Sequence, residues 1–297
     1  MLNLEHLAAL LDAHRADAAV RVTEFSVGGR PFAFNREAAI MGVINLSADS
    51  WYRESVCLSA ETAIQRGRVL AAQGADIIDV GAESTLAHAA RVDESGQNSK
   101  LLPVLRELRA ANVLVSVETY QPKVTRACLE AGANILNLTG TERGPELYRL
   151  VAENEAAVIL CFVQGANVRE VSDFSLSEDA VPMMYEFFAR ETELAAKCGV
   201  SRMFLDPGLG FYYRNLHDSA VRVRHQMKTF LNTFRLRRLG WPVCHALPHA
   251  FEYFGEEVRC AEPFFAVLAA LGKTDLFRTH EVPRIRAVLR TMGAFDR

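Results

Sequence analysis

Short apolar runs alternate with longer segments of helical periodicity from Ala39 onward, and this alternation constrains the fold more than any other feature of the chain. Between the runs, Ser59 precedes a helix predicted to reach about Gln73, and Pro122 begins another that Gly132 ends. The apolar runs read as buried strands and cover residues 39–46, 76–84, 113–119, 134–139, 157–164, 202–206, 242–247 and 276–282.

Eight such strand–helix units in series predict an α/β fold, namely a single (β/α)8 TIM barrel. An open, doubly wound sheet is the alternative. We place it second because no G-x-G-x-x-G follows the first strand, as it would in a dinucleotide-binding fold.

The residues before the first barrel strand form an N-terminal extension, 1–38. Residues 4–14 predict a short helix, and residues 22–34 alternate around Gly28-Gly29, which predicts a β-hairpin. We expect residues 1–297 to make a single domain, because this length is ordinary for one barrel.

Composition excludes several classes of protein. The formal charge of −3 gives no reason to expect a nucleic acid or an anionic membrane as partner. No apolar run approaches the ~20 residues of a membrane span, and the N-terminus lacks the pattern of a signal peptide. The six cysteines form no C-x-x-C pair, so we expect reduced core residues in a cytoplasmic protein and no zinc site.

Polar side chains cluster where the predicted strands end. Asp206, for example, closes an apolar run and is followed at once by Pro207 and Gly208. In a barrel the carboxyl ends of all strands face the same side, where active sites lie. One such residue alone is as well explained by a turn or a helix cap, but many of them together are costly to bury without a ligand or one another. The residues expected at this face are Asn45, Asp49, Ser50, Glu83, Ser84, Thr85, Glu118, Thr119, Asn137, Asp206, His245, His249, Arg278 and His280.

The chemistry of this set divides in two. Glu118, Asn137 and Asp206 offer a carboxylate, an amide and a carboxylate, which suit the N–H and NH2 groups on the edge of an amino-pyrimidinone ring. Arg278 and His280, together with the Asn45 amide, suit a phosphate or pyrophosphate. The residues therefore predict a pocket for a planar heterocycle beside an anion.

Six segments, in order, resemble the motifs of one enzyme family. They are MGVINLSADSW at 41–51, GADIIDVGAEST at 74–85, VSVETY at 115–120, AGANILN at 131–137, LDPGLGF at 205–211 and RTHEV at 278–282. The family is dihydropteroate synthase, a pterin-binding TIM barrel. The resemblance implies an enzyme that joins 6-hydroxymethyl-7,8-dihydropterin diphosphate to p-aminobenzoate and releases pyrophosphate, with Mg2+ as cofactor and a homodimer as its assembly.

The resemblance also implies roles for individual residues. Pterin binding falls to Glu118, Asn137 and Asp206, with His249 as a candidate fourth contact. Diphosphate binding falls to Asn45, Arg278 and His280, with Asn45 also on the metal. Asp206, Arg278 and His280 would carry the catalysis, and Thr85 would lie on the side of the arylamine.

Departures from the family's pattern leave alternatives open. Glu118 stands where the family has Asp, Leu86-Ala87 replace an Arg-Pro pair, and Tyr52-Arg53-Glu54-Ser55 replace the glycine-rich end of the first loop. The Ser-Arg-Lys after the seventh strand is absent, and His249 is the candidate replacement for its pterin-contacting Lys. We rank a divergent synthase first, with p-aminobenzoate or a derivative as second substrate. A non-catalytic pterin-binding paralogue and a pterin-dependent methyltransferase follow.

Overall fold

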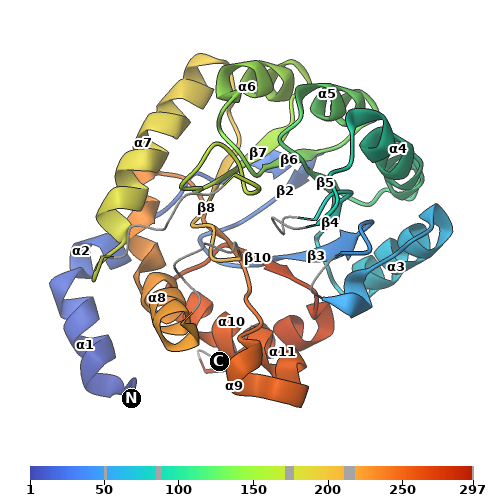
Figure 1. Ribbon diagram of the computed structural model, residues 1–297. Helices are drawn as coiled ribbons and strands as arrows, with labels where there is room; N and C mark the ends of the chain where they lie inside the picture. The colour runs from blue at the N-terminus through green and yellow to red at the C-terminus, as the bar shows by residue number, and fades with distance from the viewer. Residues whose placement is uncertain (50–51, 85–88, 171–176, 211–217, 296–297) are drawn as a thin grey trace.

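The computed structural model describes residues 1–49, 52–84, 89–170, 177–210 and 218–295, and it confirms the (β/α)8 barrel. Eight parallel strands form one sheet with helices around it (Figure 1). The strands are β3 (Ala39–Asn45), β4 (Ile77–Gly81), β5 (Val115–Glu118), β6 (Ile135–Leu138), β7 (Ala157–Cys161), β8 (Met203–Asp206), β9 (Cys244–Ala246) and β10 (Leu276–Thr279).

The sheet closes between β8 and β9. The hydrogen-bonded order is β8-β7-β6-β5-β4-β3-β10-β9, which leaves β8 and β9 at its two ends. An isolated bridge between Leu205 and Val243 joins these ends, and the Leu205 N–H donates to the carbonyl of Pro242 at 3.0 Å. The barrel is therefore complete, although this junction has fewer pairs than the others.

The outer ring of helices follows the predicted order. Ser59 caps α3, since its side chain accepts from the N–H of Thr62, and proline occupies the first turn of α5, α6, α7 and α11. The helices are α3 (Ala60–Ala72), α4 (Glu94–Ala110), α5 (Pro122–Glu130), α6 (Gly144–Glu153), α7 (Val181–Lys197), α8 (Ser219–Asn232), α9 (Phe251–Phe254), α10 (Ala261–Leu271) and α11 (Val282–Met292). Three 3-10 segments join them, η1 (Arg53–Ser55), η2 (Thr233–Leu239) and η3 (Gly255–Cys260).

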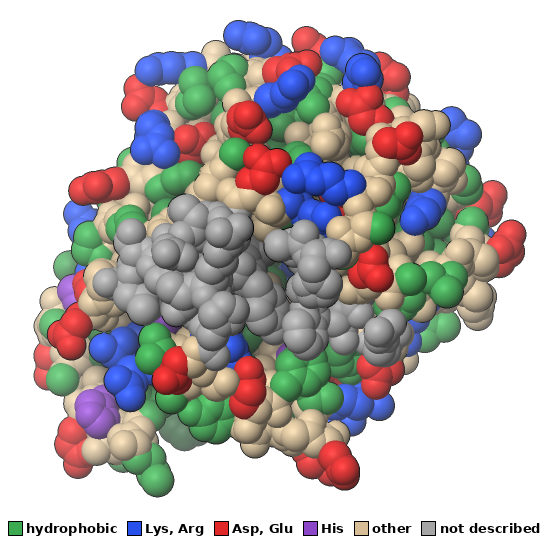
Figure 2. Space-filling view, viewed as in Figure 1, with side chains coloured by type: hydrophobic (Ala, Val, Ile, Leu, Met, Phe, Trp, Pro, Cys, Tyr) green, Lys and Arg blue, Asp and Glu red, His purple; other side chains and the backbone are tan. Residues whose placement is uncertain are grey.

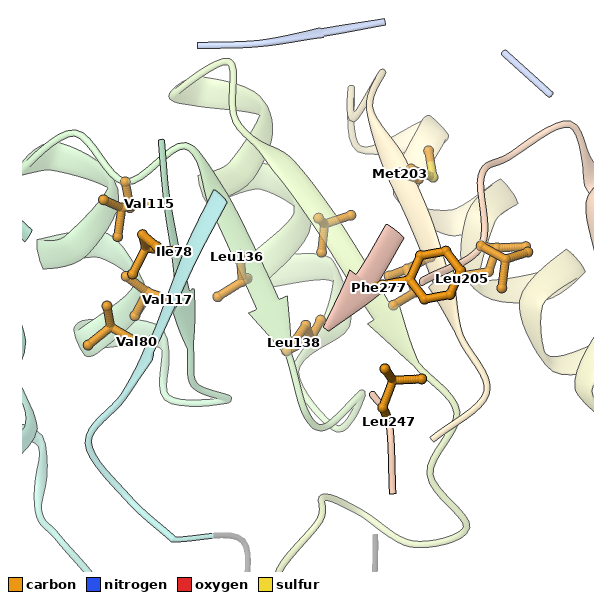
Figure 3. Close-up of a cluster of buried hydrophobic side chains, with 14 of the residues drawn as sticks. Ile78, Val80, Val115, Val117, Leu136, Leu138, Met203, Leu205, Leu247 and Phe277 are labelled. Atoms are coloured by element: carbon orange, nitrogen blue, oxygen red, sulfur yellow. The ribbon is translucent and has the colours of Figure 1, made fainter. Parts of the chain in front are cut away.

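Two apolar cores follow from the alternation of side chains along the strands. One lies between the strands and the helices and contains Ile78, Val80, Leu136 and Leu138 (Figure 3). The other fills the barrel interior. It is formed by the intervening positions, including Met41, Ile77, Ile135, Ile159, Phe204, Cys244 and Leu276.

The predicted hairpin pairs β1 (Ser26–Val27) with β2 (Arg30–Pro31) around Gly28 and Gly29, both at positive φ. It closes the amino-terminal end of the barrel, because the rings of Phe25 and Phe34 lie 5.2 and 5.4 Å from that of Phe204. The extension before it forms α1 (Leu4–Ala13) and α2 (Arg15–Ala18), which lie beside α8 in Figure 1. With this end filled by aromatic side chains, a ligand site is left to the opposite end.

Some boundaries differ from the sequence-based expectation. Strand β4 ends at Gly81 rather than at residue 84, and helix α8 gives way to the 3-10 segment η2 after Asn232. That last turn buries Arg237, whose Nη1 lies 2.6 Å from Oδ1 of the buried Asp275. All six cysteines are free. None of the helices in the described part of the chain is long and apolar enough to cross a lipid bilayer.

Candidate active site

A cavity of about 130 Å³ opens at the carboxyl ends of the strands. The face of the molecule drawn in Figure 2 carries acidic and basic side chains interspersed around the residues in grey, without a large field of one sign. Thr85 and Ser50 lie outside the described residues. Nine residues predicted for this face line the cavity together, namely Asn45, Glu83, Ser84, Glu118, Asn137, Asp206, His249, Arg278 and His280.

Strand register explains why these side chains meet. Glu118 is paired with Gly81 on one side and with Asn137 on the other. Two residues below the strand ends, the same inward-facing positions hold core residues such as Ile135 and Phe204. The interior is thus apolar below and polar at the mouth.

Arg278 connects the acidic groups of the cavity. Its Nε donates to Oδ2 of Asp79 at 2.8 Å, and its Nη2 donates to Oε2 of Glu118 at 2.6 Å. The same Asp79 oxygen accepts from Nδ2 of Asn137 at 3.1 Å. Asp79 is fully buried and was missed by the sequence analysis, although a carboxylate inside the apolar run of β4 was a usable signal.

Asp206 is held in place by its own turn. Its Oδ1 accepts from the N–H of Gly208 at 2.8 Å, and Gly208 has a φ of 73°, which favours glycine. The thiol of Cys161 lies 3.5 Å from Oδ1 of Asn137 and 3.9 Å from Oδ2 of Asp206. Within the described residues the other Asp206 oxygen, Oδ2, has only this weak sulfur contact, so it is available to a ligand that donates N–H groups.

Burial shifts the titration of both carboxyl groups. It raises the pKa of Glu118 to about 7, with the charge of Arg278 acting in the opposite direction. It raises the pKa of Asp206 to about 6, opposed by the hydrogen bond from Gly208. Both groups therefore change charge near neutral pH, as is common where a site is built to meet a ligand.

Asn45 ends β3 at the edge of the cavity. Its Nδ2 donates to Oγ of Ser55 at 2.7 Å, and that hydroxyl donates to the carbonyl of Tyr52 at 2.7 Å. The backbone carbonyl of Asn45 accepts from the N–H of Cys57 at 2.8 Å, but among the described residues no donor reaches the side-chain oxygen Oδ1. This oxygen is the part of the amide left for a cation or a ligand.

His249 and His280 lie together on one wall, around a buried glutamate that the sequence analysis did not single out. Nδ1 of His280 is 2.7 Å from Oε1 of Glu262, and Nε2 of His249 is 3.2 Å from the same oxygen. The ring of Tyr52 stacks on that of His249 and lies tilted against that of His280, at centroid distances of 4.9 and 4.7 Å. No local pattern around Glu262 in the sequence points to this role.

Three of the predicted residues that the structure describes do not line the cavity, namely Asp49, Thr119 and His245. His245 is fully buried in the helix layer, where its Nε2 lies 2.7 Å from Oγ1 of Thr233 and its ring contacts Phe230. Thr119 also faces away and accepts from the N–H of Gln121 at the start of α5. Glu83 does line the cavity, where it accepts from the hydroxyl of Tyr120 at 3.0 Å.

The (β/α)8 barrel defines a class of enzymes whose active sites lie at the carboxyl ends of the strands, where this chain places buried carboxylates and an arginine. The chain matches the family of pterin-binding enzymes over residues 41–246. It is 30% identical to the dihydropteroate synthase of Mycobacterium leprae over 265 residues, covering 86% of this chain and 93% of that protein.

Solved structures agree. The dihydropteroate synthase of Xanthomonas albilineans with 4-aminobenzoic acid superposes with a TM-score of 0.78 at 27% identity, over 93% of this chain and 98% of that one. The same enzyme in complex with 7,8-dihydropteroate gives a TM-score of 0.73 at 25% identity, over 92% and 98% of the two chains. The chain belongs to the dihydropteroate synthase family.

Proposed function

We propose that this protein condenses 6-hydroxymethyl-7,8-dihydropterin diphosphate with an arylamine, p-aminobenzoate or a derivative of it, and releases pyrophosphate. The observation that carries this proposal is that the two expected subsites are in direct contact. Arg278, which suits an anion, donates a hydrogen bond to Glu118, which suits a heterocycle. The names of the related structures, with 4-aminobenzoic acid and with 7,8-dihydropteroate, support the same substrates.

The pterin is assigned to Glu118, Asn137 and Asp206. Ionised carboxylates accept from the ring N–H and the exocyclic NH2, and an amide can donate and accept on the same edge. Asp206 and Asn137 are 3% and 2% exposed, so the ring would be read in a nearly dry environment, where such hydrogen bonds are strong. His249 follows the seventh barrel strand, β9, after which the family has its Lys. It lines the cavity and is proposed as a further contact.

The diphosphate is assigned to Arg278 and His280, with Asn45 on a Mg2+ ion. An amide carbonyl oxygen is a ligand that Mg2+ accepts, and this ion commonly takes only one or two protein ligands beside substrate phosphates. The Asn45 carbonyl fits, because its amide nitrogen is already used by Ser55. When bound, Mg2+ would neutralise charge on the diphosphate.

The reaction forms a carbon–nitrogen bond and breaks a carbon–oxygen bond and an N–H bond. The arylamine nitrogen attacks the methylene carbon of the pterin, the bond from that carbon to the diphosphate oxygen breaks, and the amine gives one proton to water. Arg278 and His280 stabilise the charge that develops on the leaving group. Arg278 must turn part of its hydrogen-bonding from Asp79 and Glu118 toward the anion for this to happen.

Calorimetry followed by a turnover assay tests the proposal. The dihydropterin diphosphate should bind to the protein in the presence of Mg2+, and p-aminobenzoate should then yield pyrophosphate and a pteroate product. Binding without release of pyrophosphate for any arylamine would support the non-catalytic paralogue instead. If neither the diphosphate nor pyrophosphate binds, the proposed function is wrong.

We also propose a homodimer in the cytoplasm. Phe264, Val267 and Leu271 are exposed at 41, 37 and 48% on one face of α10, which is unusual for large apolar side chains at this spacing. The free cysteines suit a reducing compartment. Light scattering after gel filtration, on the wild type and on Val267→Glu, tests the dimer, because the charge should shift the mass toward that of a single chain.

A further inference from the structure

Glu262 is a buried carboxylate that forms no ion pair with a lysine or arginine of the described part of the chain. It is 0% exposed, and its ion-pair partners within the described residues are His249 and His280. Arg259, which lies nearby in sequence, is bound instead to Glu281 at 2.5 and 3.0 Å. A buried carboxylate is costly unless it is paired or coordinates a metal, and two imidazoles are weak partners for it.

The geometry around Glu262 is that of a ligand set. One nitrogen from each imidazole points at the same oxygen, Oε1, and the donor atoms of all three side chains lie within 4.8 Å of one another. Ligands at about 2.0–2.2 Å from a tetrahedral ion would be roughly 3.4 Å apart. The distance of 3.2 Å from His249 to Glu262 already fits, and the 2.7 Å from His280 needs a small opening.

An unused lone pair supports this interpretation. Nε2 of His249 is buried and, among the described residues, makes no hydrogen bond of good geometry, although it lies 3.2 Å from Oε1 of Glu262. Polar atoms buried in this way usually have a partner, so each exception calls for an explanation such as an ion. A cation between the three side chains would use this nitrogen and the charge of Glu262 together.

We propose that His249, Glu262 and His280 form a binding site for a divalent transition-metal ion of the zinc class. Two imidazoles and one carboxylate are a common set for such ions, and an open coordination position remains for a ligand. Because His249 and His280 also line the active-site cavity, that position faces the cavity and accepts an oxygen of an anionic ligand. Cysteines play no part, which is why their arrangement gave no sign of a zinc site.

The surroundings hold the ligands in place. Oε2 of Glu262 accepts from the hydroxyl of Thr279 and from the backbone N–H of His280 at 3.1 Å, which turns Oε1 toward the imidazoles. The ring of Tyr52 contacts both imidazole rings, and its hydroxyl donates to Glu281. Such outer contacts fix the orientation of metal-binding histidines.

The site is distinct from the proposed Mg2+ position at Asn45, which offers an amide oxygen rather than imidazoles. It stands on the geometry of the three side chains and not on the proposed activity. It does give that activity a consequence: a metal ion at His249 would supply positive charge where the family's Lys is missing.

Cobalt provides a direct readout. The wild-type protein is treated with a chelator, dialysed and titrated with Co2+ alone, and then with Zn2+. One Co2+ per chain should bind and give visible d–d absorption of low-symmetry coordination, which one equivalent of Zn2+ should abolish. Addition of pyrophosphate should change the spectrum if the open position faces the anion site.

Two variants remove ligands and one serves as a matched control. Glu262→Gln and His249→Lys should each weaken Zn2+ binding by more than the roughly 10–100-fold that loss of an outer contact produces. His249→Lys places an ammonium beside Glu262, so it should remain folded, as circular dichroism would verify. His14→Ala removes a histidine far along the chain from the site, paired with Asp17, and should leave the stoichiometry and affinity unchanged.

The proposal is wrong if wild-type protein binds no Co2+ at micromolar concentration, or if folded His249→Lys binds it as well as the wild type. Binding of the dihydropterin diphosphate to metal-free and to zinc-loaded protein separates this result from the proposed function. Pterin binding without any zinc-class binding would remove the metal site alone, and zinc-class binding without pterin binding would remove the proposed function alone.

Discussion

Nη2 of Arg278 donates a hydrogen bond to Oε2 of Glu118 over 2.6 Å, from β10 to β5 across the mouth of the barrel. The arginine expected to bind an anion is therefore already bound to a carboxylate expected to bind a heterocycle. A ligand that binds to either residue would therefore alter the hydrogen bonds of the other residue. This contact is the reason to expect that pterin and diphosphate bind in a coupled way.

Replacement of Arg278 tests its part in anion binding. Arg278→Lys keeps the charge but loses the planar fork that serves Asp79 and Glu118 at once. We expect pyrophosphate affinity to fall by about 2–5 kcal/mol, measured by calorimetry. An affinity within a factor of two of the wild type would show that another group binds the anion. Arg222→Lys, at the rim of the cavity, is the matched control.

The pH dependence of pterin binding tests Glu118. Burial raises the pKa of Glu118 to about 7 and that of Asp206 to about 6, and the ionised forms are the better acceptors. Affinity for a dihydropterin ligand should therefore rise as the pH increases from 5 to 8. Glu118→Gln should remove the part of this rise nearest pH 7, while Glu118→Asp should retain a rise. A flat profile for the wild type would contradict the prediction.

Asp206 is expected to lower stability at high pH. Its pKa in the folded protein, about 6, lies above the ordinary value of 3.8, so the folded state holds the proton more tightly than the unfolded state does. Stability from this group falls as the pH rises from 4 to 6 and stays lower above that. Asp206→Asn should increase the free energy of unfolding at pH 8 by about 1–3 kcal/mol. Urea denaturation at pH 4 and pH 8 measures this.

The same variant, Asp206→Asn, should bind a dihydropterin ligand more weakly in calorimetry, because an amide replaces an anionic acceptor. The hydrogen bond from Gly208 can be kept by the Asn oxygen. A variant that is equally destabilised at both pH values would show instead that the carboxylate is structural.

A buried ion pair outside the site gives a prediction on the fold. Arg237 bonds Asp275, the carbonyl of Lys273 and Oδ1 of Asn35, so it ties the N-terminal extension to the segment before β10. Arg237→Ala leaves a buried carboxylate unpaired and should destabilise the protein by about 3–5 kcal/mol. Arg238→Ala, at an exposed position, should change stability by less than about 0.5 kcal/mol. Similar values for the two variants would contradict the role of the pair.

Much of the site could be predicted because it depends on local rules. The alternation of side chains and the common direction of parallel strands suffice to bring Glu118, Asn137, Asp206 and Arg278 to one mouth. His245 failed on the same rule. Strand β9 directs Cys244 and Ala246 inward, so the residue between them points to the helices, and a shift by one position reverses the face.

The remainder depends on contacts that no local pattern encodes. Glu262 lies in the first turn of α10. It contacts His249 and His280 only because the fold brings this turn next to the segments that follow β9 and β10. Tyr52 is a similar case, because its ring contacts His249 and His280, which lie nearly two hundred positions or more away in the sequence. Asp79 was visible in the sequence, but its bond to Arg278 spans the closed barrel.

The sparse pairing of β8 with β9 makes the wall of the barrel uneven. Asp206 ends β8, which pairs with β9 through a single isolated bridge. Glu118 and Asn137, in contrast, end β5 and β6, which are joined by a continuous ladder. In amide exchange, Leu205 should therefore lose protection before Val117 does. A barrel that opens more easily at the junction of β8 and β9 can admit a bulky ring and then close around it, while β5 and β6 keep their pairing.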